Sequence, residues 1–270
     1  MAKTLLITND DGIEAPGIWS LVNSLTPYFN ITVSAPATDH SGASSSVSIR
    51  KSVHTKQIDP SPFLTSKPKY NVSAYSSEGT PGDSCIIGIE CIHDNAGIDL
   101  VVSGINKGAN VGSDTIVSGT VGAAIQGYVR SIPSIAISIA SIEEPIFETA
   151  ATYASQMCRQ LLSESSLPNV LLNINVPSLP INEIKGAQVT KLGGRSWAES
   201  IKASNTTEGT SYYFTRDQKL FENAYPGTDL FAIDNQYISV TPLTPDLSLT
   251  NEQSVTFSQQ LINALSTNTT

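Results

Sequence analysis

The chain has 270 residues, a formal net charge of -9 and a sequence pI of about 4.7. Hydrophobic residues make up 40% of it and charged residues only 14%, which excludes the apolar-poor, highly charged composition of disordered proteins. The acidic excess argues against a protein that grips a nucleic-acid duplex, because that work needs clustered Lys and Arg. It still allows one anion to bind locally, through a metal ion or through backbone amides.

The targeting signals expected of secreted and membrane proteins are missing from the sequence pattern. The first apolar run, residues 5–7, is shorter than the roughly 7–15 residues of a secretory segment, and no run approaches the ~20 residues of a membrane helix. Cys85, Cys91 and Cys158 form no CxxC pair, which makes a disulfide framework or a zinc site an unfavourable interpretation. We therefore expect a cytoplasmic protein without a membrane partner.

The first two-thirds of the chain alternate short apolar runs with helical patterns. In chain order the patterns predict a strand at 4–8, a helix at 18–25, a strand at 31–35, a helix at 80–92, a strand at 99–103, a helix at 117–128, a strand at 134–139, a helix at 143–162 and a strand at 170–176. Strands that alternate with helices indicate an α/β fold, with a mostly parallel sheet and helices on both faces.

The last third has a different character. Residues 186–234 are polar, aromatic and Gly-containing, which favours extended β-hairpins, and they precede a predicted strand at 237–240 and a terminal helix at 254–265. This segment is too thin to bury a core of its own. We expect an α/β body at 1–180 and a C-terminal extension at 181–270 that packs on the body or reaches a partner subunit.

Polar side chains follow three of the predicted strands. Asn9, Asp10 and Asp11 follow the first strand, a Ser-rich segment at 39–46 follows the second, and Asn106 follows the strand at 99–103. Ligands of open parallel sheets bind outside the carboxyl ends of the strands, so these groups are expected to converge. All of them offer hard oxygen ligands, which suit Mg²⁺ or Mn²⁺ better than zinc. A divalent ion would also relieve the repulsion between the adjacent carboxylates.

Simpler interpretations exist for each of these segments taken alone. Asn-Asp-Asp-Gly is a common turn sequence, and a Ser-rich segment is more often a plain loop. Ser118, Gly119 and Thr120 open a predicted helix, where free backbone amides favour a bound phosphate, although Ser118 can equally be a simple helix cap. The joint occurrence of polar segments after three strands favours a metal site, and a neighbouring metal ion favours the phosphate interpretation of the helix start. The sequence contains no GxxxxGK[ST], GxGxxG or GxSxG motif.

Several ordered motifs together identify a family resemblance. Residues 8–17 (TNDDGIEAPG), 40–44 (HSGAS), 79–83 (GTPGD), 102–110 (VSGINKGAN) and 118–121 (SGTV) resemble the stationary-phase survival protein SurE family, whose members are metal-dependent 5′/3′-nucleotidases. The motifs cover about the first 130 residues. The resemblance implies a Rossmann-like body, one divalent metal ion, nucleoside monophosphate substrates, and homodimers or homotetramers formed through C-terminal segments.

The resemblance also assigns the metal ligands, and the expected mechanism assigns the base and the phosphate contacts. The family's metal ligands correspond to Asp10, Asp11, Ser41 and Asn106, and either Asp10 or Asp11 is expected to act as the general base. The expected contacts of the phosphate and the substrate are Asn9, Asn110, Ser118, Gly119 and Thr120. The chain departs from the family at Ala37, Thr38 and His40, where members often carry Asp and Arg side chains.

The expected function is hydrolysis of a phosphomonoester by a 5′-nucleotidase, a phosphoric monoester hydrolase, with 3′-nucleotides and short polyphosphate as further possible substrates. One alternative is a non-catalytic module that senses a phosphometabolite with the same metal and anion pocket. Another is a different metal-dependent hydrolase on this scaffold, because a fold does not fix a function. Turnover that requires a metal ion distinguishes an enzyme from a sensor.

Overall fold

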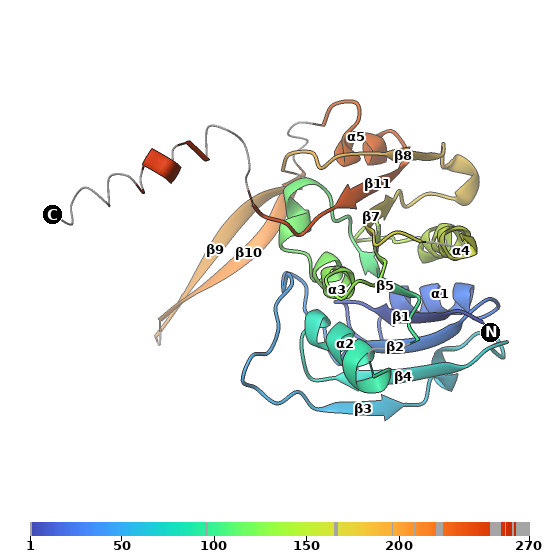
Figure 1. Cartoon of the computed structure of the whole chain (residues 1–270). Coiled ribbons are helices and arrows are strands. Elements are labelled where there is room, and N and C mark those ends of the chain that lie inside the picture. The colour runs from blue at the N-terminus through green and yellow to red at the C-terminus, as the bar shows by residue number, and fades with distance from the viewer. Residues whose placement is uncertain are drawn as a thin grey trace.

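The computed structural model describes residues 2–94, 97–164, 167–195, 197–207, 209–219, 224–248, 255–256, 258–260 and 262. Its body is a nine-stranded sheet with helices on both faces, and a separate two-stranded hairpin projects from this body (Figure 1). In the part of the chain that is described, no helix is both long and apolar enough to cross a membrane.

The sheet is mostly parallel. Its strands, in the order in which they lie side by side, are β3 (Thr55–Ile58), β4 (Val72–Ser77), β2 (Asn30–Pro36), β1 (Thr4–Thr8), β5 (Leu100–Lys107), β6 (Ser134–Ile139), β7 (Leu171–Val176), β11 (Ile238–Leu243) and β8 (Ala187–Val189). The six strands from β4 to β7 pair in parallel, whereas β3 pairs antiparallel with β4 and β11 pairs antiparallel with β7. The central strands are covered on both faces, which explains their apolar runs.

Two pairs of helices cover the sheet. The helices α1 (Pro16–Leu25) and α4 (Phe147–Ser163) pack together on one face, and α2 (Pro81–Ile87) and α3 (Gly119–Tyr128) pack together on the other (Figure 1). The α1 helix buries Ile18, Leu21, Val22 and Leu25, the stripe that its sequence period predicts. A π-helical turn at Gly88–Ile92 continues α2, and short 3₁₀ turns occur at Ser61–Phe63, Gly112–Ile116 and Ile181–Glu183.

The predicted α/β class is confirmed, with two differences of extent. The α4 helix begins at Phe147, four residues later than the predicted start at 143. Pro145 explains the delay, because a proline disfavours helical geometry in the residue before it. The β5 strand continues to Lys107 beyond a register shift between Ser103 and Asn106. Asn106 therefore lies within the strand and not in the loop after it.

The segment from 181 onward contributes both to the sheet and to the projecting arm. The predicted hairpin is formed by β9 (Trp197–Thr206) and β10 (Gly209–Lys219). The prediction of hairpins throughout 186–234 missed the helix α5 (Asp229–Asp234) and the strand β8, and the strands β3 and β4 were also not predicted. In the predicted terminal helix, residues 255–256, 258–260 and 262 are helical, and the rest of that prediction lies outside the described residues.

Candidate metal and phosphate site

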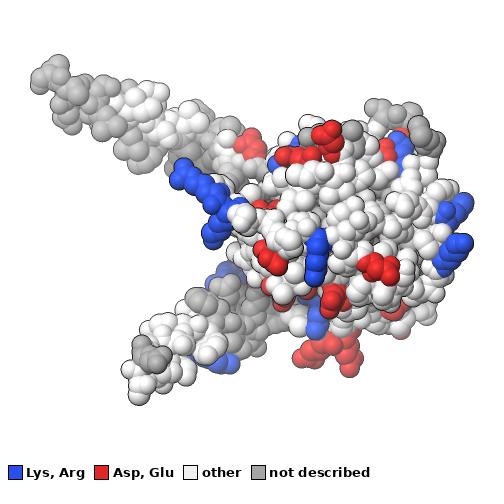
Figure 2. All heavy atoms as spheres, turned by 90° about the horizontal axis from the view of Figure 1, so that it is seen from below, with Lys and Arg blue, Asp and Glu red and all other residues white. Residues whose placement is uncertain are grey.

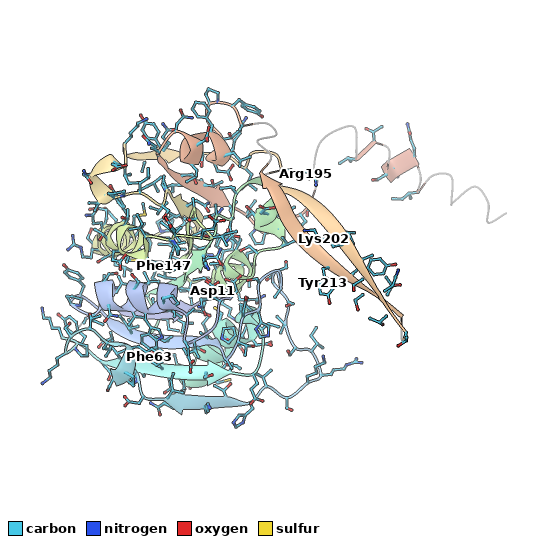
Figure 3. The ribbon with its side chains drawn as sticks, turned by 180° about the vertical axis from the view of Figure 1, so that it is seen from behind. Asp11, Phe63, Phe147, Arg195, Lys202 and Tyr213 are labelled. Atoms are coloured by element: carbon cyan, nitrogen blue, oxygen red, sulfur yellow. The ribbon has the colours of Figure 1, made fainter. Side chains whose placement is uncertain are left out.

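The predicted site residues lie at the carboxyl ends of three neighbouring parallel strands. The strands β2, β1 and β5 are consecutive in the sheet, with Ile7 of β1 opposite Val33 and Val102. The side chain labelled Asp11 in Figure 3 lies at this edge of the sheet, near the start of α3. The convergence that the strand ends predict is therefore present in the fold.

Asp10 is buried against the start of α3. Its Oδ1 accepts a hydrogen bond of 2.6 Å from the hydroxyl of Thr120. A Cβ atom placed on Gly119 would lie 2.7 Å from the Asp10 Cβ, so only glycine allows the helix to begin this close. Burial raises the pKa of Asp10, and the hydrogen bonds from Thr120 oppose that rise.

Asp11 lies beside Asp10 and is more open to solvent. Its Oδ2 accepts a hydrogen bond of 3.2 Å from the backbone amide of Lys107. Burial, followed by the charge of Asp10, raises the pKa of Asp11 to about 7, with a smaller contribution from Asp39. The Lys107 amide and ammonium oppose this rise. The two neighbouring carboxylates thus repel each other and would gain from a cation placed between them.

The side chains of Asn106 and Ser41 differ in burial and in their hydrogen bonds within the protein. Asn106 is buried and its Nδ2 donates to the carbonyl of Gly108 at 2.7 Å, which fixes the amide and leaves its Oδ1 as the acceptor end. Ser41 is exposed, and both its amide and its hydroxyl donate to Oδ1 of Asp39 at 2.7 Å. The preceding residue in this loop, His40, is tied to the site because its amide donates to the carbonyl of Asp10 at 2.8 Å.

The donor set fits a hard divalent cation. All the candidate ligands are oxygen atoms, two of them carboxylates, which is the chemistry of Mg²⁺ and Mn²⁺ sites. Asn9 supports this interpretation, because its Nδ2 donates to the Gly12 carbonyl while its fully buried Oδ1 has no protein partner. Within the described residues no group of three or more His, Cys, Asp or Glu is arranged to hold a metal, so a cation here would need the oxygens of Asn or Ser.

The start of α3 is only partly free to bind an anion. The Ser118 hydroxyl accepts a hydrogen bond of 3.1 Å from the Val121 amide, so this side chain is the cap of the helix. The amide and the hydroxyl of Thr120 both bind Asp10. Gly119 is the residue at this helix start that combines a backbone amide with the absence of a side chain. The capping interpretation is therefore confirmed for the Ser118 hydroxyl. The anion interpretation stays a prediction and concerns the backbone groups of the helix start.

Asn110 is fixed from the inside of the sheet. Its Nδ2 donates to the Ser138 hydroxyl at 2.9 Å, and its backbone amide donates to Oδ1 of Asn175 at 2.7 Å. The carbonyl of Asn110 accepts from Nδ2 of both Asn173 and Asn175. The sequence pattern predicted the strand at 170–176 but no role for these two buried Asn side chains. They hold Asn110 in place instead of contacting a ligand themselves.

The motif at 79–83 anchors the Ser-rich loop. Thr80 and Asp83 form a reciprocal capping box at the start of α2. Oδ1 of Asp83 also accepts from the amide of Ser48 at 2.9 Å, and the hydroxyl of Thr80 donates to the carbonyl of Ser46. Hydrogen bonds hold the pKa of Asp83 below its usual range despite its burial. This family-like motif thus has a structural role that its sequence alone predicted only as a helix start.

The charged side chains are spread over the molecule. On the face drawn in Figure 2, Lys and Arg side chains stand singly or in small groups among acidic ones over the body. The two ion pairs described, Lys3–Asp99 at 2.7 Å and Arg130–Glu90 at 2.6 Å, both lie at the surface. This distribution resembles the surface of an ordinary acidic protein.

Comparisons with known proteins agree with the motifs. Residues 5–199 match the family described as survival protein SurE. The chain is 39% identical over 247 residues to a Clostridium botulinum protein named 5′-nucleotidase SurE, covering 90% of this chain and 94% of that protein. A Legionella pneumophila protein of the same name is 38% identical over 244 residues, covering 90% and 92% of the two chains.

A solved structure shows the same architecture. The SurE protein of Aquifex aeolicus superposes with a TM-score of 0.78 at 33% sequence identity, covering 96% of this chain and 99% of that one. The sequence match extends over most of the chain and the structural match over nearly all of it. With its strand-end carboxylates and its helix start in the arrangement described above, the chain belongs to the SurE family.

Proposed function

We propose that this protein is a metal-dependent phosphomonoesterase that hydrolyses nucleoside 5′-monophosphates, and also 3′-monophosphates, to nucleoside and phosphate. The observation that carries the proposal is the pair of neighbouring carboxylates, Asp10 and Asp11, packed against the start of α3. Relatives at 38–39% identity that are named 5′-nucleotidase SurE support the choice of substrate.

Four side chains would hold one Mg²⁺ or Mn²⁺ ion: Asp10, Asp11, Asn106 and Ser41. When bound, the ion supplies the positive charge that offsets negative charge on the phosphate in the transition state. Ser41 can join the set with its oxygen lone pairs while its hydroxyl continues to donate its hydrogen bond to Oδ1 of Asp39. Asn9, with its unpartnered buried Oδ1, would orient a substrate or water atom beside this set.

The phosphate would be held by the start of α3 and by the loop before it. The backbone at Gly119 allows close approach, and the amides of the first helical turn direct partial positive charge toward an anion. Asn110 and Ser118 would complete this cradle, Ser118 through its main-chain amide because its hydroxyl caps the helix. Thr120 would support the cradle by holding Asp10.

Water attacks the phosphorus atom in line with the leaving nucleoside oxygen, and a carboxylate accepts its proton. Asp11 is the better candidate for this base. The carboxylate of Asp10 is engaged by Thr120 at 2.6 Å, whereas Asp11 has one longer contact of 3.2 Å and faces solvent in part. The leaving oxygen then takes up a proton from water, and the carboxylate gives the proton it accepted to the hydroxide so formed. Nucleoside and inorganic phosphate are released and the carboxylate is regenerated.

The decisive experiment measures phosphate release from a panel of nucleoside 5′- and 3′-monophosphates and from short polyphosphate, with Mg²⁺, with Mn²⁺ and with a chelator. We expect turnover that the chelator abolishes and that added metal restores. Asp11→Asn should lower kcat by at least about 100-fold, because it removes both a ligand charge and the base. Asp59→Asn, a matched change in an exposed turn, should leave turnover unchanged.

Each alternative outcome has a definite meaning. Nucleotide binding without turnover of any phosphomonoester would replace the enzyme with a sensing module. Turnover that survives the chelator, or that Asp11→Asn leaves at the full rate, would refute the metal mechanism while leaving hydrolysis in place.

The C-terminal extension, residues 181–270, is proposed to mediate a homodimer or homotetramer of cytoplasmic protein around the catalytic body at 1–180. The projecting hairpin supports this assignment because Ile201, Tyr212 and Tyr213 are at least 60% exposed on it (Figures 1 and 3). Light scattering of the full chain and of a Tyr212→Ser, Tyr213→Ser variant tests it, with a smaller particle expected for the variant.

A further inference from the structure

The loop from Gly108 to Ser118, which we call the phosphate loop, connects β5 to α3. It carries Asn110 and Ser118, so its role rests on the proposed function. Its inner side is fixed by the buried Asn side chains of β7. Its outer side is held by Asp229, the first residue of α5, which the proposed chemistry does not use.

Asp229 is a fully buried carboxylate whose partners are backbone amides. Its Oδ2 accepts from the Gly112 amide at 2.8 Å, and its Oδ1 accepts from the amides of Gly193 at 2.7 Å and Leu230 at 2.8 Å. Burial raises the pKa of Asp229, and these hydrogen bonds oppose that rise. One side chain thus joins three segments: the phosphate loop, the residues before the hairpin, and α5.

The residues before the hairpin, 191–194, also touch the phosphate loop directly, and we call them the hairpin root. The Ser113 amide donates to the Gly194 carbonyl at 3.2 Å. Gly112 has φ +53°, and a Cβ atom placed on it would lie 1.8 Å from the Gly194 oxygen. There is no space for a side chain between the two segments, so they are in backbone-to-backbone contact.

The hairpin root is bonded to α5 as well. The Asp229 amide donates to the Lys191 carbonyl at 3.0 Å, and the Lys191 amide donates to the Gly227 carbonyl at 3.0 Å. β9 begins at Trp197, shortly after this root, and Figure 3 shows Arg195 at the base of the hairpin. The arm therefore leaves the body at the point where Asp229 binds the phosphate loop.

We propose that Asp229 is a positioning residue that fixes the phosphate loop to the hairpin root, so that affinity for phosphate depends on this carboxylate while affinity for the metal does not. The two affinities separate because the residues concerned lie in different segments of the chain. Asp10 and Asp11 follow β1 and Asn106 lies on β5, and none of them lies in the loop that Asp229 holds. Asn110 and Ser118, the proposed phosphate contacts, both lie in that loop.

Asp229→Asn tests the proposal with almost no change of volume. The amide group has one acceptor oxygen, so at least one of the three backbone donors loses its partner inside the protein. We expect the Kd of inorganic phosphate, measured by calorimetry with Mn²⁺ present, to rise about tenfold. The Kd of Mn²⁺ alone should stay within about twofold of the wild type, and KM for the nucleotide should rise more than kcat falls.

Two further variants keep the test decisive. Asp234→Asn makes the same change on an exposed residue of the same helix and should alter none of these constants. Gly193→Ala approaches the contact from the other side, because its Cβ would lie 3.2 Å from Oδ1 of Asp229 and 2.8 Å from the Leu230 side chain. Gly193→Ala should also raise the Kd of phosphate. It serves as the test of the proposal if Asp229→Asn does not fold.

The proposal is overturned if a folded Asp229→Asn protein binds phosphate as tightly as the wild type. It is also overturned if Mn²⁺ and phosphate affinity fall together, since that result indicates general damage. Failure of the proposed function looks different: the wild type then binds phosphate but turns over no nucleotide, and the comparison of phosphate affinities still holds.

Discussion

The hydroxyl of Thr120 donates to Oδ1 of Asp10 at 2.6 Å, and this contact joins two elements that are 110 residues apart. It fixes the first carboxylate of the site to the first turn of α3, beside the Gly119 backbone. Because Asp10 is buried, a hydrogen bond to its ionised form is worth more than one at the surface. The proposed metal-binding and phosphate-binding halves of the site thus share one bond.

Thr120→Val should weaken both halves. The substitution keeps the shape of the side chain and removes the donor, so ionised Asp10 becomes less stable in its buried position. A hydrogen bond to a charged group is worth about 1.5–3 kcal/mol, which predicts a loss of about 10- to 100-fold in Mn²⁺ affinity by calorimetry. Thr120→Ser, which retains the hydroxyl, should stay close to the wild type. Equal affinities for the Val and Ser variants would contradict the role given to this bond.

Asp83→Ala should destabilise the fold more than it affects the chemistry directly. It removes the reciprocal half of the capping box with Thr80 and the acceptor of the Ser48 amide. Loss of such a cap costs about 1–2 kcal/mol, to be measured as a lower free energy of unfolding in urea. Asp59→Ala is the matched control, since Asp59 accepts from Ser61 in an exposed turn. An unfolding free energy equal to that of the control would show that the box adds no stability.

Asn175→Leu should disturb the phosphate loop from inside the sheet. Asn175 accepts from the amide of Asn110 and donates to its carbonyl, so leucine leaves both backbone groups buried without this partner. The cost of one unsatisfied buried group is about 1–3 kcal/mol. We expect both lower stability in urea and a higher Kd for phosphate. Asn169→Leu, at an exposed position just before the same strand, should leave phosphate affinity unchanged.

Much of this fold could be predicted because apolar periodicity is a local signal. The buried stripe of α1 and the runs of β1, β5 and β6 follow directly from it. The strands β3 and β8 lie at the sheet edges with exposed positions, so they carry no apolar run to detect. α5 has only six residues, too few for a clear helical period. At its start Thr228 accepts from the nearby Phe231 amide, and Asp229 accepts from the Gly112 amide far away in the chain, which an apolar pattern does not predict.

The residues of the candidate site could be predicted from the sequence, but most of their hydrogen-bond partners could not. The strand ends placed Asp10, Asp11 and Asn106 together because the carboxyl ends of parallel neighbours meet at one edge. The partners of these groups come from far along the chain, as Thr120 and Asn175 show, and no local spacing announces them. The role of the Ser118 side chain is local by contrast, because its hydroxyl accepts from the Val121 amide in the first turn of the same helix.

The pKa of Asp11 predicts how the metal-free protein responds to pH. In the fold this pKa is raised to about 7, whereas in the unfolded chain it returns to about 3.9. Between these values the folded state binds more protons than the unfolded state. Stability should therefore fall as pH rises from about 4 to about 7, by at most about 1.4 kcal/mol per pH unit, and should level off above that range.

Urea unfolding in a chelator between about pH 5 and about pH 8 measures this effect, and Asp11→Asn isolates it from the titration of other groups. The variant should show a shallower decline, because Asp10, whose pKa burial also raises, still contributes to it, and the variant should be more stable than the wild type at about pH 8. Added Mn²⁺ should reverse that order, because the ion stabilises the folded wild type by mass action and the variant has lost a ligand. A wild type whose chelated stability runs parallel to that of Asp11→Asn over the whole range would show that Asp11 titrates normally, and the electrostatic account of the paired carboxylates would then be wrong.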